Sequence, residues 1–240
     1  MNKSVSIIIP VYNEEKFIFK LIEKIKKIDF TYLRLDYEII VVNDGSTDNT
    51  KEILSKIDGI KVIDQINSGK GSAVQKGIKH SKADLILIQD ADLEYDPNDY
   101  YSLLEPFKSD EKISVYGSRP KNVFNKENLF VDRHHNQKYG PYFMNKLLCF
   151  FFKFLFNISL TDPLTGYKVY ERNFFLKNKI YSTGFEADHE ITVKLMRSNY
   201  KFIEVPIKYN PRTVKEGKKI NFIDAVIAFY ILLKLKLMKY

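Results

Sequence analysis

Cysteine, tryptophan and long apolar runs are scarce or missing in this sequence of 240 residues. The single cysteine, Cys149, excludes an intrachain disulfide framework and a four-thiolate zinc site, and it favours a reducing, cytosolic compartment. Ten glycines and eight prolines are too few for a collagen-like or low-complexity chain. Since 45% of the residues are hydrophobic, a disordered chain is also excluded. The composition predicts one sizeable globular domain.

No apolar run is long enough for a comfortable membrane span. The longest, Leu147 to Leu160, is interrupted by Lys153 and Asn157. The first residues have neither an apolar signal core nor a small-residue cleavage site, so we expect no signal peptide. The segment from Phe222 to Tyr240 is apolar but is punctuated by Lys234, Lys236 and Lys239. We therefore expect residues 221–240 to form a basic amphipathic C-terminal helix that rests on an anionic membrane surface.

The formal net charge of +8 is unevenly distributed along the chain. Residues 1–100 carry 14 basic and 17 acidic side chains, whereas residues 201–240 carry 9 basic and 3 acidic ones. A basic tail of this kind is expected to face an anionic partner. Nucleic acid lacks support, because the sequence has no recognised binding module and no interleaved aromatic platform. A phosphorylated ligand and an anionic membrane are therefore the expected partners.

Short runs rich in Ile and Val alternate with helical segments in the first half of the chain. The runs that predict strands are Val5–Ile9, Glu38–Val42, Lys61–Ile63, Leu85–Gln89 and Ile113–Tyr116. The segments that predict helices are Glu14–Ile28, Asp48–Ile57, Ser72–His80 and Asn98–Phe107. Ser46 or Thr47 is expected to cap the second helix. The alternation predicts an α/β fold, a Rossmann-like and mainly parallel sheet with helices on both faces.

The second half of the chain has a different pattern. An irregular loop is expected over residues 121–138, followed by an apolar helix within Leu147–Leu160 and a turn at Asp162–Gly166. A helix is then expected at Glu186–Arg197 and a strand at Phe202–Ile207. We find no linker that would separate a second domain.

Polar residues cluster where three of the expected strands end. Asn13 to Glu15 follow the first strand, Asn43 to Asp48 follow the second, and Asp90 and Asp92 follow the fourth. Ligands of such sheets bind beyond the carboxyl ends of the strands, so we expect these residues at one rim. Asp90 and Asp92 are two apart and share one side of an extended segment, where they suit Mg²⁺ held together with substrate phosphates. Glu94 is a further candidate ligand, direct or through water.

Several other chemistries lack their motifs. Gly69-Lys70-Gly71 has neither the P-loop nor the dinucleotide spacing, which argues against ATPases and dehydrogenases; it is either a tight turn or a phosphate contact. The pairs His134-His135 and His189-Glu190 lack the spacing of a zinc protease, and no G-x-S-x-G elbow is present. Glycoside hydrolysis needs two carboxylates across a sugar, whereas adjacent aspartates on one strand end suit a metal better.

The ordered set of motifs resembles family 2 glycosyltransferases, on the segments Pro10–Glu15, Asp44–Asp48 and Gln89–Glu94. Later segments are similar to the branch of dolichyl-phosphate mannosyltransferase and its bacterial polyprenyl-phosphate relatives: Gly117–Arg119, Gly166–Lys168, Gly184–Glu186 and Glu204–Ile207, continuing through Arg212 to Lys218. The resemblance implies a GT-A type fold and an inverting, metal-dependent transfer of a hexose from a nucleoside-diphosphate sugar to a polyprenyl phosphate, dolichyl or undecaprenyl. The implied cofactor is Mg²⁺ or Mn²⁺.

The resemblance also implies the roles of particular residues. The positions that match the nucleoside site are Pro10, Tyr12, Glu14, Val42 and Asp44. Those that match the metal and diphosphate site are Asp90, Ala91, Asp92 and Glu94, of which Asp90, Asp92 and Glu94 are the expected metal ligands. Those that match contacts to donor or acceptor phosphates are Arg119, Lys168, Arg212 and Lys218. Asp92, Arg119 and Arg212 are the expected catalytic residues.

Two alternatives stay open beside this interpretation. A family 2 transferase that acts on a sugar hydroxyl in a surface glycan needs a general base, for which the candidates are Glu186, Asp188 and Glu190. The second alternative is a non-catalytic protein that binds a nucleotide or serves as a membrane adaptor. Under the main interpretation, residues 1–220 form the transferase domain, with a nucleotide-sugar half (1–120) and an acceptor half (121–220). We expect a peripheral protein on the cytoplasmic face of a membrane, either alone or with a separate membrane-protein partner.

Overall fold

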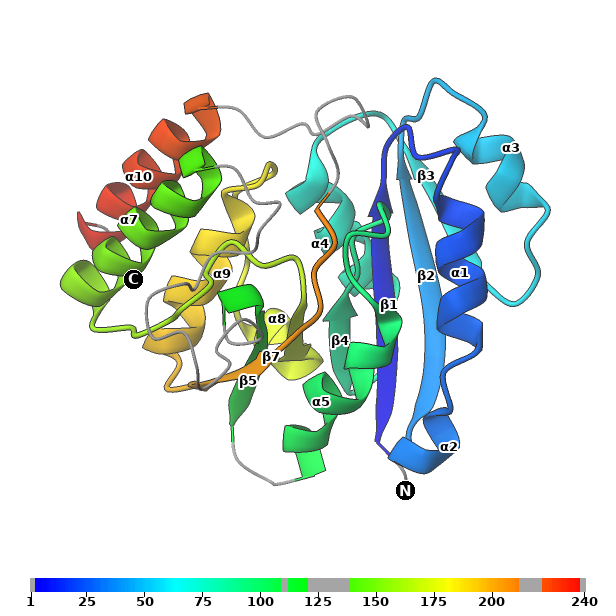
Figure 1. The fold of residues 1–240 in the computed structure, drawn as a ribbon, viewed down its shortest axis with the longest axis horizontal. Helices are drawn as coiled ribbons and strands as arrows, with labels where there is room; N and C mark the ends of the chain where they lie inside the picture. The colour runs from blue at the N-terminus through cyan, green and yellow to red at the C-terminus, as the bar shows by residue number, and fades with distance from the viewer. Residues whose placement is uncertain (1–2, 109–111, 121–138, 212–221, 238–240) are drawn as a thin grey trace.

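The computed structural model describes residues 3–108, 112–120, 139–211 and 222–237, and within them seven strands form one sheet. The strands run in the spatial order β3-β2-β1-β4-β6-β5-β7. The part β3-β2-β1-β4 can be followed in Figure 1. Their bounds are β1 (Ser4–Val11), β2 (Asp36–Asp44), β3 (Lys61–Gln65), β4 (Leu85–Ile88), β5 (Ile113–Ser118), β6 (Lys168–Glu171) and β7 (Lys201–Pro206). All neighbouring strands are parallel except β6, which lies antiparallel between β4 and β5. The predicted mainly parallel sheet is confirmed, whereas β6 was not expected.

Helices cover both faces of the sheet because successive strand residues point to opposite sides. In β1, Ile7 packs into the core under one group of helices and Ile8 into the core under the other. The first group is α1 (Ile18–Lys26), α2 (Phe30–Leu33), α3 (Thr50–Ser55) and α5 (Tyr100–Leu104), the last flanked by the 3₁₀ turns η1 (Pro97–Asp99) and η2 (Glu105–Lys108). The second group is α4 (Lys70–His80), α7 (Tyr139–Phe156), α8 (Arg172–Lys177), α9 (Ala187–Arg197) and α10 (Phe222–Leu237).

Helix boundaries differ from the expected ones in informative ways. α1 begins at Ile18 rather than at Glu14, and the backbone N–H of Glu14 donates to the Thr50 hydroxyl (2.9 Å). Neither predicted cap of α3 is used: the N-cap is Asn49, while the Ser46 hydroxyl accepts from the N–H of Asn13 (3.0 Å). The loops after β1 and β2 thus satisfy some of each other's backbone groups.

The far end of the sheet carries α7 and α10, which lie side by side (Figure 1). The ring centroids of Phe151 on α7 and Phe229 on α10 are 4.6 Å apart. Within the described residues, no helix combines the length and the apolar character that crossing a bilayer requires. The predicted loop over 121–138 and the predicted site residues Arg212 and Lys218 lie outside the described residues.

Candidate functional site

The loops that follow β1 and β2 meet at one rim of the sheet, as predicted. The strands are in register with Pro10 opposite Val42, so the chain leaves both at the same level. Asn13 joins the two loops, because its side-chain oxygen accepts from the N–H of Thr47 (2.7 Å). Pro10 and Val42 are buried, whereas the ring of Tyr12 is exposed above the strand end. Of these residues, Tyr12 offers the open surface that a nucleoside needs.

Asp44, at the end of β2, holds the turn that leads into α4. Its carboxylate accepts from the N–H of Ser68 (2.8 Å), the N–H of Gly69 (2.9 Å) and the side-chain amide of Gln65 (2.7 Å). Gly69 has a φ of +94°, and a Cβ there would lie 2.7 Å from the carbonyl oxygen of Thr183. The turn therefore needs both a glycine and the buried Asp44 carboxylate, and it places Lys70 at the first position of α4.

Asp90 lies just beyond β4 and meets this turn. The Lys70 ammonium is 2.5 Å from Asp90 Oδ1, with 18% and 22% of the two side chains exposed. On its other side, Asp90 Oδ2 would be only 2.1 Å from a Cβ at position 166, so Gly166 is what gives the carboxylate its room. Burial opposes the positive charge of Lys70, but the carboxylates of Asp90 and Asp188 outweigh burial and raise its pKa.

Asp92 and Glu94 diverge after Asp90. Leu93 has a φ of +59°, and this left-handed residue lets Asp92 Oδ1 accept from the N–H of Glu94 (3.1 Å). Glu94 is buried, and its carboxylate accepts from the hydroxyl of Tyr209 (2.7 Å). In the ranges that the structure describes, no three His, Cys, Asp or Glu side chains are grouped to hold a metal ion. Glu94 is engaged by Tyr209 in this arrangement, and its role as a ligand beside the two aspartates stays a prediction.

Asp90 and Asp92 nevertheless fit a divalent cation that substrate phosphates also hold. Mg²⁺ is commonly bound through one or two carboxylates plus phosphate oxygens, and both aspartates are only partly buried. The Lys70 ammonium against Asp90 Oδ1 shows that the position accepts a positive charge. A left-handed non-glycine residue beside such carboxylates is typical of functional sites.

Lys168 lies beneath this pair rather than at the surface. Only 1% of its side chain is exposed, and its ammonium is 3.1 Å from Asp188 Oδ2. Burial lowers the pKa of Lys168, although the charge of Asp188 opposes this effect. Burial raises the pKa of Asp188, but Lys168 and Lys70 outweigh it and leave that pKa below its usual value. Lys168 is thus buried in an ion pair with Asp188, and its contact to a phosphate stays a prediction.

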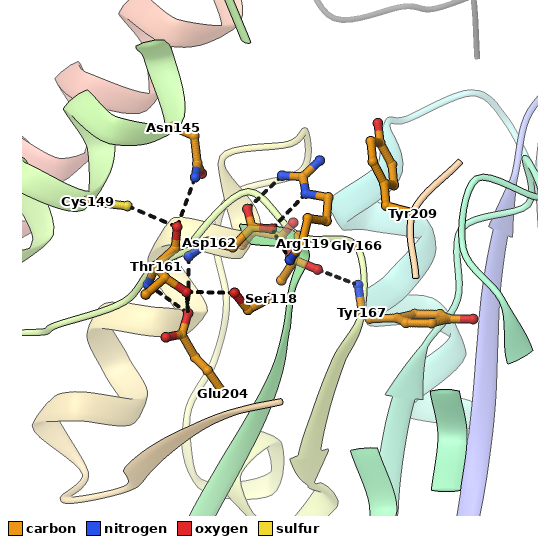
Figure 2. Close-up of polar contacts among 12 residues, drawn as sticks. Ser118, Arg119, Asn145, Cys149, Thr161, Asp162, Gly166, Tyr167, Glu204 and Tyr209 are labelled. Atoms are coloured by element: carbon orange, nitrogen blue, oxygen red, sulfur yellow. Dashed lines mark hydrogen bonds and ion pairs between the residues drawn. The ribbon is translucent and has the colours of Figure 1, made fainter. Parts of the chain in front are cut away.

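Arg119 follows β5 and is held by Asp162. Its Nε and Nη2 atoms donate to the two Asp162 oxygens at 2.7 and 2.6 Å, and its backbone N–H donates to the same carboxylate (Figure 2). The guanidinium also lies over the Tyr209 ring, 4.9 Å from the centroid. Burial opposes the charge of Arg119, yet Asp162 raises its pKa well above the usual value. Arg119 is therefore a fixed cation with a two-pronged anchor.

A second acid anchors the segment that carries Asp162. Glu204 on β7 accepts from the N–H groups of Thr161 (2.7 Å) and Asp162 (3.1 Å) and from the Thr161 hydroxyl (Figure 2). The Thr161 carbonyl accepts from the Asn145 side chain of α7 (3.0 Å). Sequence reasoning noted Asp162 only as part of a turn and gave Glu204 no role. The signal for Asp162 was an acid at the start of the turn Asp162–Gly166, and its pairing with Arg119 accounts for that acid.

The candidate general bases are engaged in structural contacts. Glu190 is buried, accepts from the N–H groups of Tyr181 and Ser182, and pairs with the Lys194 ammonium at 2.7 Å. Burial opposes its charge, but these partners lower its pKa. Asp188 is paired with Lys168, and Glu186 accepts from the N–H of Gly184 (3.0 Å). A carboxylate with a lowered pKa is a weak base, so Asp188 and Glu190 are poor proton acceptors.

Comparison with known proteins places these features in a family. Residues 6–177 match the model described as Glycosyl transferase family 2. A UDP-N-acetylglucosamine–dolichyl-phosphate N-acetylglucosaminyltransferase of Methanococcus voltae is 26% identical over 99% of this chain and 98% of its own. A dolichol-phosphate mannosyltransferase of Pyrococcus furiosus is 30% identical, and glycosyltransferase AglJ of Haloferax volcanii 29%. This chain spans only 58% and 64% of the lengths of those two relatives.

The fold has a close counterpart among solved structures. Glucosyl-3-phosphoglycerate synthase of Mycobacterium tuberculosis, in a complex with Mn²⁺, uridine diphosphate and phosphoglyceric acid, superposes with a TM-score of 0.73. The match covers 99% of this chain and 80% of that one, at 17% identity. At this level of identity the likeness concerns the fold alone, and it confirms the predicted GT-A type architecture.

Proposed function

This chain belongs to glycosyl transferase family 2 and is a glycosyltransferase, and from that premise we propose that it transfers a hexose from a nucleoside-diphosphate sugar to a polyprenyl phosphate. The transfer inverts the anomeric carbon and uses Mg²⁺ or Mn²⁺. Support for the acceptor comes from the relatives in Methanococcus voltae and Pyrococcus furiosus, whose names specify dolichyl or dolichol phosphate. Support for the metal comes from the Mn²⁺ and uridine diphosphate bound in the structural counterpart.

The choice of a phosphate acceptor rests on one observation: the carboxylates that could act as a general base are already bound to other groups. A sugar hydroxyl must lose its proton during transfer, which requires a base with an accessible carboxylate. Asp188 and Glu190 are held in ion pairs with Lys168 and Lys194, and the pKa of each is lowered. A phosphate acceptor is already anionic near neutral pH and needs no base. Glu186, the third candidate, accepts a hydrogen bond from the N–H of Gly184 (3.0 Å). With two of the three candidate bases held in ion pairs, the site suits a phosphate better than the hydroxyl of a surface glycan.

In the proposed reaction an acceptor phosphate oxygen forms a bond to the anomeric carbon. The bond from that carbon to the donor diphosphate breaks, and its electron pair leaves with the nucleoside diphosphate. Arg119, fixed by Asp162, stabilises negative charge at the phosphates, and Tyr12 faces the nucleoside. Asp90 and Asp92 would hold a divalent cation, which would supply electrostatic stabilisation of the leaving diphosphate. Arg212 and Lys218, outside the described residues, are proposed as further phosphate contacts.

The exposed face of α7 supports an approach to the membrane where such an acceptor resides. Phe143, Phe150 and Phe154 are 68%, 60% and 74% exposed, and their spacing of seven and four residues puts them on one helix face. α10 packs beside α7 and exposes Tyr230 and Leu237. We infer that this pair of helices lies on the cytoplasmic face of a membrane, as a peripheral contact.

Lys236, which was expected to contact the membrane, instead packs against α7. The Lys236 ammonium donates to the carbonyl of Leu155 on α7 (2.6 Å) and lies over the Phe156 ring. Lys236 therefore helps to hold α10 against α7. Lys234 is exposed, which leaves it available for anionic headgroups, and the exposed phenylalanines of α7 supply apolar contact that the tail alone was expected to give.

The proposed function is tested by incubating the protein with a labelled nucleotide sugar, a divalent cation and either a short polyprenyl phosphate or an oligosaccharide. We expect label to enter the organic phase only with the polyprenyl phosphate. Label that stays in water and elutes with the oligosaccharide would support the hydroxyl acceptor instead. A panel of nucleotide sugars in the same assay identifies the base and the hexose.

A further inference from the structure

The ion pair between Lys70 and Asp90 occupies the position where the cation of the proposed function is expected. The ammonium is 2.5 Å from Asp90 Oδ1, and a metal ion bound to the same oxygen would lie against it. Two positive charges this close repel each other strongly where water is largely excluded. The ammonium and the metal ion are therefore competitors for Asp90.

The backbone around Lys70 is fixed, so only its side chain is free to respond. Asp44 holds the N–H groups of Ser68 and Gly69. At Gly71 a Cβ would lie 2.6 Å from the carbonyl oxygen of Gly184, and the next N–H, of Ser72, donates to Thr183 (2.8 Å). The turn is thus locked between β2 and the start of α9. The four-carbon stem of a lysine has the freedom to move its ammonium while the turn stays in place.

A second carboxylate and the donor itself offer the displaced ammonium new partners. The charge of Asp188 already acts on Lys70, and the Phe185 ring lies 5.7 Å from the ammonium. Lys70 is also the first residue of α4, whose amino end attracts anions such as a diphosphate. An ammonium leaving Asp90 therefore has a negatively charged environment to enter once a donor is bound.

We propose that Lys70 is the resident counter-ion of Asp90 in the free enzyme and moves to the donor diphosphate when donor and metal bind together. Lys70 thereby makes metal binding depend on the donor. This inference rests on the proposed function, because it takes Asp90 as a metal ligand and a diphosphate as the leaving group. It assigns Lys70 two successive contacts, to Asp90 in the free enzyme and to the donor diphosphate in the complex.

The test measures Mn²⁺ binding to the purified protein without nucleotide, from the electron paramagnetic resonance signal of the free ion. Wild-type protein should bind Mn²⁺ weakly, and Lys70→Met should bind it about tenfold more tightly, because a charge-assisted hydrogen bond no longer competes. With uridine diphosphate present the order should reverse, because Lys70→Met lacks the contact to the diphosphate. Lys79→Met, at an exposed lysine in the last turn of α4, is the matched control and should behave like wild type.

Three outcomes would overturn the proposal. The first is an unchanged or weaker Mn²⁺ affinity in Lys70→Met protein whose thermal unfolding curve shows that it is folded. If Lys70→Met does not fold, Lys70→Gln is measured in its place, with the same expected result. The second is a tighter affinity in Lys70→Arg, which keeps the positive charge. The third is a gain that persists in Lys70→Met combined with Asp90→Asn. Failure of sugar transfer to polyprenyl phosphate, with the gain in Mn²⁺ affinity intact, would refute the proposed acceptor and leave the role of Lys70 standing.

Discussion

Gly166 gives the sharpest structural prediction, because it is the residue that leaves room for Asp90. A Cβ at this position would lie 2.1 Å from Asp90 Oδ2 and 2.9 Å from Asp90 Cγ, whereas real Cβ contacts essentially never fall below 3.0 Å. In Gly166→Ala the Asp90 oxygen must move by at least 0.9 Å, the difference between 3.0 and 2.1 Å. Such a shift disturbs the contact of Asp90 with Lys70 and moves the carboxylate that we propose as a metal ligand.

A misplacement of this size costs about 100-fold in rate, or about 2.7 kcal/mol of transition-state stabilisation. The assay is kcat for transfer of labelled sugar to polyprenyl phosphate at saturating donor. Gly59→Ala is the matched control, since Gly59 has a φ of +72° but no atom within 4 Å of the place that a Cβ would take, and it lies just before β3. This variant should lose about 1 kcal/mol of stability and keep its kcat. A wild-type kcat in Gly166→Ala would refute the reasoning.

Three other parts of the molecule give further predictions. Asp92→Ala should abolish metal-dependent transfer and keep the fold; wild-type turnover would remove Asp92 from the site. Double substitution of Phe150 and Phe154 by Asp should reduce flotation with anionic liposomes, whereas Phe19→Asp, at an exposed phenylalanine of α1, should not; equal flotation of both would contradict the membrane face. Burial and Lys168 lower the pKa of His189 from 6.5 to about 4, so the unfolded state binds the proton first as the pH falls. The free energy of unfolding should therefore drop by about 3 kcal/mol between pH 6.5 and 4. Urea denaturation of His189→Phe should lack this loss, and an equal loss in both proteins would contradict it.

The sequence predicted the parallel part of the sheet because β1, β2 and β4 are short apolar runs that end in polar residues. It did not predict β6, because the four residues Lys168–Glu171 are too short a run to stand out as a strand. Their strand conformation comes from pairing with β4 and β5 on both sides, which is tertiary information.

The candidate site shows the same division. The position of Asp44 and Asp90 at the rim of the sheet follows from the ends of β2 and β4, which the local sequence pattern predicts. The partner of each charge does not: Glu94 meets Tyr209 and Arg119 meets Asp162 across long stretches of chain. Lys168 matched a phosphate-contact position by resemblance, but its place in a central strand buries it against Asp188. Which charged side chains are buried, and which partners they have, could therefore be learned only from the folded structure.

The central claim is that the acceptor atom is a phosphate oxygen. Phosphorus-31 nuclear magnetic resonance of the reaction mixture tests it directly, because a phosphomonoester and a phosphodiester have distinct signals. We expect the polyprenyl phosphomonoester signal to decline as a phosphodiester signal and free nucleoside diphosphate appear in equal amounts. An unchanged phosphomonoester signal, while the sugar appears on an added glycan hydroxyl, would contradict the account.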